Sequence, residues 1–171
     1  NSNFDYSLVL FHACFNGETD VALSVINKIG VVNPNVNFNF IPSLFHACNN
    51  RMDDVVEEII NRYDFKNNKI IDTSILVYLY ENKMGSSLLK LFDTLDFVNI
   101  LNFLSKYINH PIDDQNNTIL ISACAHSNND LAIKLLEVNG IDYNKKNSNN
   151  TTPLIVACAN GLIDVVKKLL M

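Results

Sequence analysis

The sequence predicts an all-α fold in which a helix-turn-helix unit repeats along the chain, and three observations predict it. The dipeptide Ala-Cys occurs four times, ending at Cys14, Cys48, Cys124 and Cys158. The first two copies are separated by about 34 residues, the last two by the same interval, and the two pairs by a little more than twice that interval. An Asp follows six residues after each Cys, and a pair of apolar residues follows each Asp and recurs four residues later. A fixed interval of this length is typical of repeat proteins, in which each unit buries its apolar face against its neighbours.

Each unit has two segments of different character. The first, or inner, segment is short, apolar and built around small residues, as in residues 120–124, so its backbone can approach a neighbour closely. The second, or outer, segment carries the apolar doublets, such as Val165-Val166 and Leu169-Leu170. Doublets at this spacing give a helix a wide apolar stripe. We therefore expect the outer helix to touch both its own inner helix and the adjacent unit.

The ends of these helices carry residues suited to them. The Asp of each unit lies near the start of the outer helix, where a carboxylate can accept amide hydrogen bonds and favours the positive end of the helix dipole. These residues are Asp20, Asp54, Asp130 and Asp164. Gly17 and Gly161 fall between the two helices of their units, where a left-handed turn suits glycine. Arg51 and Ser127 occupy the same place and should be mildly strained there.

The wider gap, between Cys48 and Cys124, must hold one further, longer unit. Asp96 lies about 34 residues before Asp130 and about 42 residues after Asp54, which leaves roughly eight extra residues and puts an outer helix at residues 96–101. We expect a degenerate third unit with a third helix, or with a long helix broken at Gly85. An alternative alignment makes residues 74–82 the inner helix and residues 86–94 the outer one. The sequence leaves both alignments open.

One stretch carries a family resemblance. Residues 152–161 read Thr-Pro-Leu-Ile-Val-Ala-Cys-Ala-Asn-Gly and are followed by Val-Val-Lys-Lys-Leu-Leu at residues 165–170. This resembles the ankyrin repeat family, whose consensus is close to T-P-L-H-x-A-A, two variable positions, G, and a helix of the V-V-x-x-L-L type. The tetratricopeptide family shares the period, but its signature Trp, Tyr and Pro positions are absent.

The resemblance implies an ankyrin-type solenoid of about five stacked helix-turn-helix repeats with an atypical, extended third repeat. The repeats would cover approximately residues 7–40, 41–72, 73–112, 113–146 and 147–171, within a single domain over residues 1–171. The starts of the first two units depart from the consensus, so their turns should be less regular. The chain opens without Met or a signal peptide and stops at Met171 within an apolar helix, so we interpret it as a fragment of a longer chain with further repeats or domains.

Composition excludes several classes of function. Thirteen basic against eighteen acidic residues give a net charge of −5 without a basic cluster, which argues against nucleic-acid binding. The longest wholly apolar run, residues 75–80, is far shorter than the roughly 20 residues of a membrane span. No glycine-rich phosphate loop, nucleophile elbow or His-Glu-x-x-His pattern is present. We therefore expect no catalytic, cofactor-binding or metal-binding residues, and no enzyme activity.

The four Cys residues are expected to be small buried residues at one repeat position. Stacked neighbours would put their Cα atoms roughly 8 to 10 Å apart, too far for a disulfide and too far for zinc ligands to converge. Free thiols in every repeat suit a reducing interior, so we expect an intracellular, cytoplasmic location. His12 and His46 are expected to be structural and His110 a loop residue. His126 lies at a position that the family often uses for contacts, and a solvated surface His is the alternative.

The function that the resemblance implies is a protein-protein interaction module that binds a protein partner through its concave hairpin and inner-helix surface. The family's variable positions give the contact candidates, with the third unit left out because its register is open. On the inner helices they are Phe15, Asn16, Asn49, Asn50, Ala125, His126, Ala159 and Asn160. On the hairpins they are Phe38, Asn39, Ile41, Asp114, Gln115, Asn117, Ser148, Asn149 and Thr151.

Phe15, Phe38 and Ile41 are the best anchors among them, since exposed apolar residues contribute more to binding than Asn. Packing of these residues against an N-terminal neighbour is the competing interpretation. Two other functions stay open: a regulatory or substrate-recruiting domain of a larger enzyme or channel, and a purely structural stack.

Overall fold

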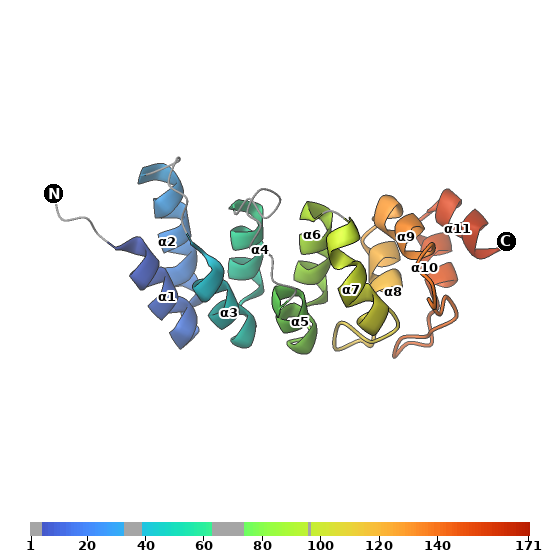
Figure 1. Ribbon diagram of the computed structural model, residues 1–171, viewed down its shortest axis with the longest axis horizontal. Helices are drawn as coiled ribbons and strands as arrows, with labels where there is room; N and C mark the ends of the chain where they lie inside the picture. The colour runs from blue at the N-terminus through green and yellow to red at the C-terminus, as the bar shows by residue number, and fades with distance from the viewer. Residues whose placement is uncertain (1–4, 33–38, 63–73, 96) are drawn as a thin grey trace. The chain divides into compact units, whose positions relative to one another are not determined.

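The computed structural model describes residues 5–32, 39–62, 74–95 and 97–171, and over these residues the regular structure is helical (Figure 1), apart from an isolated antiparallel bridge between Pro111 and Thr118. The chain forms two compact units, Asn1–Tyr78 and Leu79–Met171, and each is described by itself.

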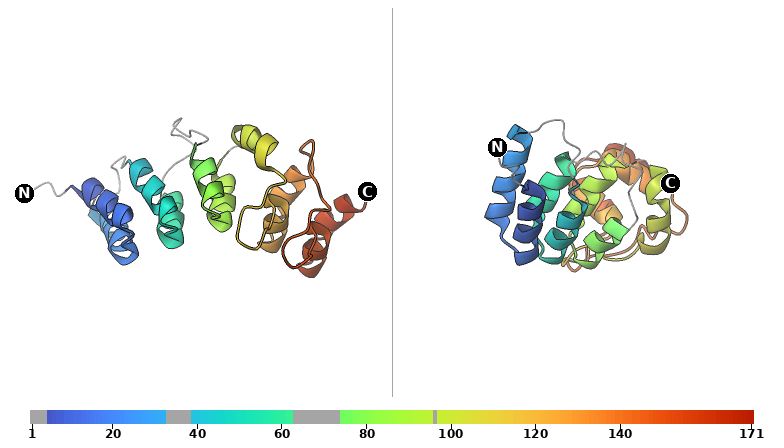
Figure 2. Two further views of the ribbon diagram at one scale, coloured as in Figure 1. Left: turned by 90° about the horizontal axis from the view of Figure 1, so that it is seen from below. Right: turned by 60° about the vertical axis from the view of Figure 1, so that its left-hand side comes forward.

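The first unit contains two helix pairs and the start of a third. Its helices are α1 (Tyr6–Asn16), α2 (Thr19–Val32), α3 (Ile41–Asn49), α4 (Asp53–Arg62) and the first part of α5 (Ser74–Glu81). The inner helices α1 and α3 pack against each other, and so do the outer helices α2 and α4. Figure 2 shows these two pairs, blue and teal, lying side by side.

The second unit contains the end of α5 and six further helices. These are α6 (Gly85–Thr94), α7 (Phe97–Tyr107), α8 (Ile119–Ala125), α9 (Asn129–Leu135), α10 (Pro153–Ala159) and α11 (Ile163–Leu169). The inner helices α8 and α10 pack together, as do the outer helices α9 and α11, and α6 packs against α8. Within each unit the helix pairs are thus stacked, and the predicted all-α repeat fold is confirmed.

The same turn joins the inner and outer helices of five pairs. Its central residue has a positive φ: 74° at Gly17, 51° at Arg51, 60° at Lys83, 55° at Ser127 and 67° at Gly161. In each turn the N–H of this residue donates to the carbonyl three residues earlier, and the next N–H donates to the carbonyl five residues earlier. The non-glycine residues therefore adopt the left-handed conformation that the sequence predicts for Arg51 and Ser127, at a cost in strain.

This turn fixes the register of the third pair. Lys83 lies between α5 and α6 and has the place that Arg51 and Ser127 hold in the pairs before and after it, so α5 is the inner helix and α6 the outer one. The alternative alignment is thus correct. The placement of an outer helix after Asp96 is wrong, because the extra residues come after the third pair and form the additional helix α7. Asp96 itself lies outside the described residues.

The additional helix covers an aromatic side chain. In the third turn Leu79 and Tyr80 stand where the other pairs have Ala and Cys. The Tyr80 ring lies 4.4 Å from the Tyr107 ring and 6.1 Å from the Phe103 ring, between centroids, and both of these rings belong to α7. Burial, with smaller contributions from Tyr107 and Glu81, raises the pKa of Tyr80. The Tyr80 ring, which replaces the Cys of the other pairs, thus packs against α7, a helix that the other pairs lack.

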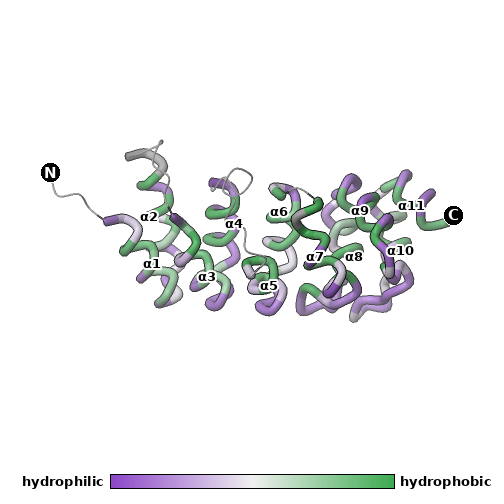
Figure 3. The backbone as a smooth tube through the Cα atoms, in the orientation of Figure 1, coloured by the Kyte–Doolittle hydropathy of each residue, from purple (hydrophilic) through white to green (hydrophobic). Residues whose placement is uncertain are grey.

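The apolar doublets of the outer helices contribute to the core, to a different extent in each helix. In α4 all four doublet residues are buried: Val55, Val56, Ile59 and Ile60. By contrast, Val21 in α2 and Leu170, directly after α11, are exposed. Figure 3 shows hydrophobic residues along the helices and hydrophilic ones in the hairpins before α8 and α10. The outer helices α2, α4, α9 and α11 each pack against their own inner helix and against the outer helix of an adjacent pair, so the expected packing is confirmed for them.

Side-chain caps begin several helices. Asp20, Asp54, Asp130 and Asp164 lie in the first turns of their helices, as expected. The cap of α9 is nevertheless made by Asn128, whose Oδ1 accepts from the N–H of Leu131 at 3.1 Å. Thr118 and Thr152, at matching positions of successive repeats, cap α8 and α10 in the same way.

Candidate functional site

An exposed group of aromatic rings joins the first two helix pairs. The side chain of Phe15 on α1 is 57% exposed. Its ring stacks on Phe11 at a centroid distance of 6.2 Å and meets the edge of His46, on α3, at 5.1 Å. Phe11 and His46 are 4.9 Å apart. We call Phe11, Phe15 and His46 the aromatic patch. It is formed by inner helices, the part of each repeat for which contacts were predicted.

Histidines contribute to this patch in two ways. His46 is half-buried between the two Phe rings, which agrees with the structural role expected of it. His12 is exposed and touches the Phe11 ring edge-on at 5.5 Å. The sequence signal for the patch was the recurrence of Phe-His at residues 11–12 and 45–46, but it did not reveal that the rings meet across the repeats.

Asparagine amides tie the inner helices together. The Nδ2 of Asn50 donates to the carbonyls of Cys14 at 2.7 Å and Phe15 at 3.2 Å. In the second unit Asn160 donates in the same way to the Cys124 carbonyl at 3.0 Å. Both of these contact candidates therefore also have an intramolecular role in stacking. The other inner-helix candidates Asn16, Asn49, Ala125 and Ala159 are exposed.

His126 occupies the position of Asn50 and Asn160 in the fourth repeat. It is exposed, and its Nδ1 donates to the Ser122 carbonyl at 2.9 Å. Its Nε2 lies 3.5 Å from the Ser86 hydroxyl. His126 is thus a surface residue held in place by two polar contacts.

The two hairpins of the second unit repeat one hydrogen-bond pattern. Asp113 accepts from the N–H groups of Gln115 and Asn117, and Asn147 accepts from those of Asn149 and Thr151. The hairpins are also bonded to each other, because the Asn147 amide donates to the side-chain carbonyl of Asn117 at 2.8 Å.

The hairpin candidates differ in accessibility. Asn117 is buried, and its amide nitrogen donates to Asp113. Ser148 and Gln115 are both exposed, and the N–H of Ser148 donates to the Gln115 carbonyl at 2.9 Å. The remaining exposed candidates of these hairpins are Asp114 and Asn149, and Thr151 is half-buried.

The hairpin candidates of the first unit are only partly described. Phe38 lies outside the described residues. The Oδ1 of exposed Asn39 accepts from the N–H of half-buried Ile41, at the start of α3.

Acidic residues follow the central residues of the two turns next to the aromatic patch. Glu18 and Asp20 follow Phe15 through the first turn, and Asp53 and Asp54 follow Asn50 through the second. Burial raises the pKa of Asp53, with further contributions from neighbouring acidic groups, while Arg51 acts in the opposite direction. The first unit holds nine acidic and five basic residues, so it carries most of the chain's net charge.

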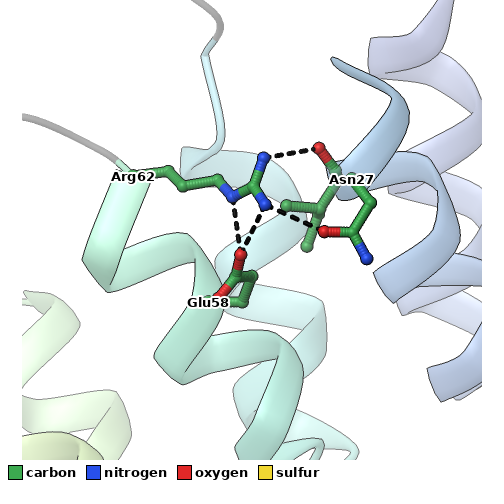
Figure 4. A network of polar contacts seen from close by, with 4 residues as sticks. Asn27, Glu58 and Arg62 are labelled. Atoms are coloured by element: carbon green, nitrogen blue, oxygen red, sulfur yellow. Dashed lines mark hydrogen bonds and ion pairs between the residues drawn. The ribbon is translucent and has the colours of Figure 1, made fainter. Parts of the chain in front are cut away.

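An arginine network links the outer helices of the first unit and was not anticipated (Figure 4). Arg62, on α4, bonds Glu58 at 2.6 Å within its own helix. Its guanidinium also donates to the Ile26 carbonyl at 3.0 Å and to the Asn27 Oδ1 at 2.9 Å, both on α2. Asn50 and Arg62 each donate to a main-chain carbonyl 36 residues earlier, so both bonds join equivalent parts of successive repeats.

The thiols do not form a site. Cys14, Cys48 and Cys124 are buried free cysteines, as expected, and burial raises the pKa of the Cys14 thiol to about 11 and of the other two to about 12. The expectation of burial is wrong for Cys158, which is exposed because no helix pair of the described residues covers that side of α10. Within the described ranges no group of His, Cys, Asp and Glu is arranged to hold a metal ion.

Comparison with known proteins supports the resemblance. A family model described as ankyrin repeats (3 copies) matches residues 88–171. No curated protein matches the chain. In the part of the chain that the structure describes, no helix is long and apolar enough to span a membrane.

Proposed function

Because residues 88–171 belong to the ankyrin repeat family, we propose that the chain is a non-catalytic module that binds a protein partner through its inner helices and hairpins. Ankyrin repeats generally mediate protein-protein interaction and are typically non-catalytic. The first unit lies outside the matched residues. Its two turns have the same hydrogen bonds and positive φ values as those at Ser127 and Gly161, which supports extending the family's function to it.

The exposed ring of Phe15 is the observation that carries the proposal. An aromatic side chain that is more than half exposed in a preformed cluster loses little conformational freedom on binding. Such residues supply a large share of the free energy at protein interfaces. Because Phe11 and His46 hold the ring, it is available to a partner without rearrangement.

Charge suggests what the partner presents. The acidic residues at and after the first two turns favour a positively charged segment. Lys or Arg side chains can also stack on exposed aromatic faces. We therefore propose a partner with a Lys- or Arg-rich segment that lies across the aromatic patch.

The other contact candidates differ in whether their side chains already bond other parts of the chain. Exposed residues without a described side-chain role are the stronger candidates, and these include Asn16, Asn49, Ala125 and Ala159. Asn50, Asn117 and Asn160 already bond other parts of the chain, so their substitution would disturb stacking as well as binding.

Binding of Lys- and Arg-rich peptides to the purified chain tests the proposal. Phe15→Ser should weaken binding by roughly 30-fold, the loss expected of a major interface residue, with an unchanged melting temperature. Ile155→Ser is a matched control, because Ile155 is similarly exposed on an inner helix of the other unit. Equal affinity of wild type and Phe15→Ser, or equal binding of acidic peptides, would reject the aromatic patch as the site.

The three buried free thiols suit a reducing, cytoplasmic environment.

An alternative role is that the repeats recruit substrates for an enzyme or channel. They would then use the same surface, and binding of a peptide taken from such a substrate would depend on Phe15.

A further inference from the structure

Asparagine precedes glycine at three places, Asn16-Gly17, Asn139-Gly140 and Asn160-Gly161. This dipeptide is chemically vulnerable because the glycine nitrogen can attack the asparagine side-chain carbonyl carbon, and glycine has no Cβ to obstruct the attack. The reaction needs a glycine N–H that is not engaged and a backbone that can rotate into line. The three sites share their chemistry, so their structural surroundings decide which of them reacts.

Two of the three sites are protected by the turn described above. The N–H of Gly17 donates to the Cys14 carbonyl, and that of Gly161 donates to the Cys158 carbonyl, both at 3.2 Å. The side-chain amide of Asn160 is also engaged, by the Cys124 carbonyl. Attack at either site would require a helix end to open first.

Asn139 lies in a different setting. It is exposed, in a turn closed by a long hydrogen bond of 3.4 Å from the N–H of Ile141 to the Val138 carbonyl. The φ of Gly140 is 84°, which matches the third position of a type II turn. The N–H of Gly140 makes no hydrogen bond to any residue that the structure describes. The attacking group is therefore unengaged, and the hydrogen bond that closes the turn itself is long.

We propose that Asn139 is a site of spontaneous deamidation in the folded protein. The Gly140 nitrogen forms a bond to Cγ of Asn139 and loses its proton to solvent, while the side-chain nitrogen gains a proton and leaves as ammonia. The resulting five-membered succinimide is opened by one water molecule at either carbonyl. The product is aspartate, or isoaspartate with the main chain running through the former side chain. No oxidant or cofactor takes part.

Deamidation of Asn139 would affect the turn that Asn109 anchors in the second unit. The Asn109 side chain, just beyond α7, donates to the Gly140 carbonyl at 2.7 Å and accepts from the Asp142 N–H at 2.7 Å. Isoaspartate adds a methylene to the main chain next to these two anchored points, so both bonds would be strained. Asn139 also lines a groove of about 430 Å³ with Phe97, Leu101 and Glu137. The new carboxylate would stand close to Glu137, which pairs with Lys168 at 2.7 Å.

Peptide mass mapping of protein kept at mildly alkaline pH tests the proposal, with Asn16 and Asn160 as internal controls. In the native protein, Asn139 should gain the mass of deamidation roughly tenfold faster than Asn160, which must first break two hydrogen bonds. In concentrated urea the three sites should react at similar rates. Native Asn139 reacting no faster than Asn160 would overturn the proposal, and so would a preference for Asn139 that persists in urea.

Two variants sharpen this test. Asn139→Gln should remove the product at residue 139 and leave the other two sites unchanged. Asn109→Ala releases both anchors of the turn, so it should speed deamidation of Asn139 without affecting Asn16. An Asn109→Ala protein that stays folded and shows the wild-type rate at Asn139 would contradict the assigned role of the turn.

Discussion

The side-chain amide of Asn50 donates a hydrogen bond to the main-chain carbonyl of Cys14 at 2.7 Å, 36 residues earlier in the chain. Asn160 has the same relationship to Cys124. In both cases the acceptor is a carbonyl near the end of an inner helix that also accepts the N–H of the following turn residue, so the amide is its second donor. Stacking of neighbouring repeats thus adds a hydrogen bond to the one that the turn already makes.

Removal of this amide should weaken stacking. We expect Asn50→Ala to lower the free energy of unfolding by about 1 kcal/mol, because it leaves the Cys14 and Phe15 carbonyls without this donor. Urea denaturation measures the change. Asn49→Ala, at the exposed neighbouring position, should change stability by less than about 0.5 kcal/mol. Equal effects of the two substitutions would show that the amide contributes nothing.

Strain in the left-handed turns should be relieved by glycine. Ser127 has a φ of 55° and an exposed side chain, so Ser127→Gly should raise the free energy of unfolding by roughly 0.5 to 1 kcal/mol. Ser24→Gly, at an exposed site within α2, should instead lower it by about 0.5 kcal/mol. Thermal melts of the pair test this. The same sign for both variants would contradict the strain argument.

Gly85 should not tolerate a side chain. A Cβ at this residue would lie 3.2 Å from the carbonyl oxygen of Ile112 and 3.3 Å from its side chain. Gly85→Ala should therefore destabilise the protein by about 1 to 3 kcal/mol, although alanine is the better helix former. Ser86→Ala, at the exposed next residue, is the control for helix propensity. A melting temperature for Gly85→Ala at or above that of Ser86→Ala would contradict this prediction.

Thiol reactivity should separate Cys158 from the other cysteines. Thiolate is the reactive form, and the pKa values of about 11 to 12 leave the three buried thiols protonated at neutral and mildly alkaline pH. We expect a thiol reagent to modify one cysteine quickly in the native protein and all four in denaturant. Cys158→Ser should abolish the fast reaction. A fast phase that survives this substitution would show that a buried cysteine is accessible.

The repeat period and the turn positions could be predicted from sequence because they depend on local backbone needs. Small residues, apolar doublets and a left-handed turn recur at fixed spacing, and the structure has them there. The third pair does not follow this pattern, because Leu79 and Tyr80 replace Ala-Cys and its turn at Lys83 follows the turn at Arg51 slightly sooner than the period predicts.

Other features depend on contacts between repeats, which spacing alone does not reveal. Arg62 and Asn50 look like ordinary surface residues in the sequence, yet both bond carbonyls of the preceding pair. The covering of Tyr80 by α7 likewise depends on how rings pack in three dimensions.

The amide-to-carbonyl bonds across the stack have a consequence for engineering. Their acceptors are main-chain groups, which every amino acid supplies, so only the donor residue has to be specified. A block one repeat long that brings its own asparagine could in principle be duplicated or exchanged without redesign of the block before it. Such a chain could be lengthened one block at a time, with the graft point chosen at a turn that already has glycine.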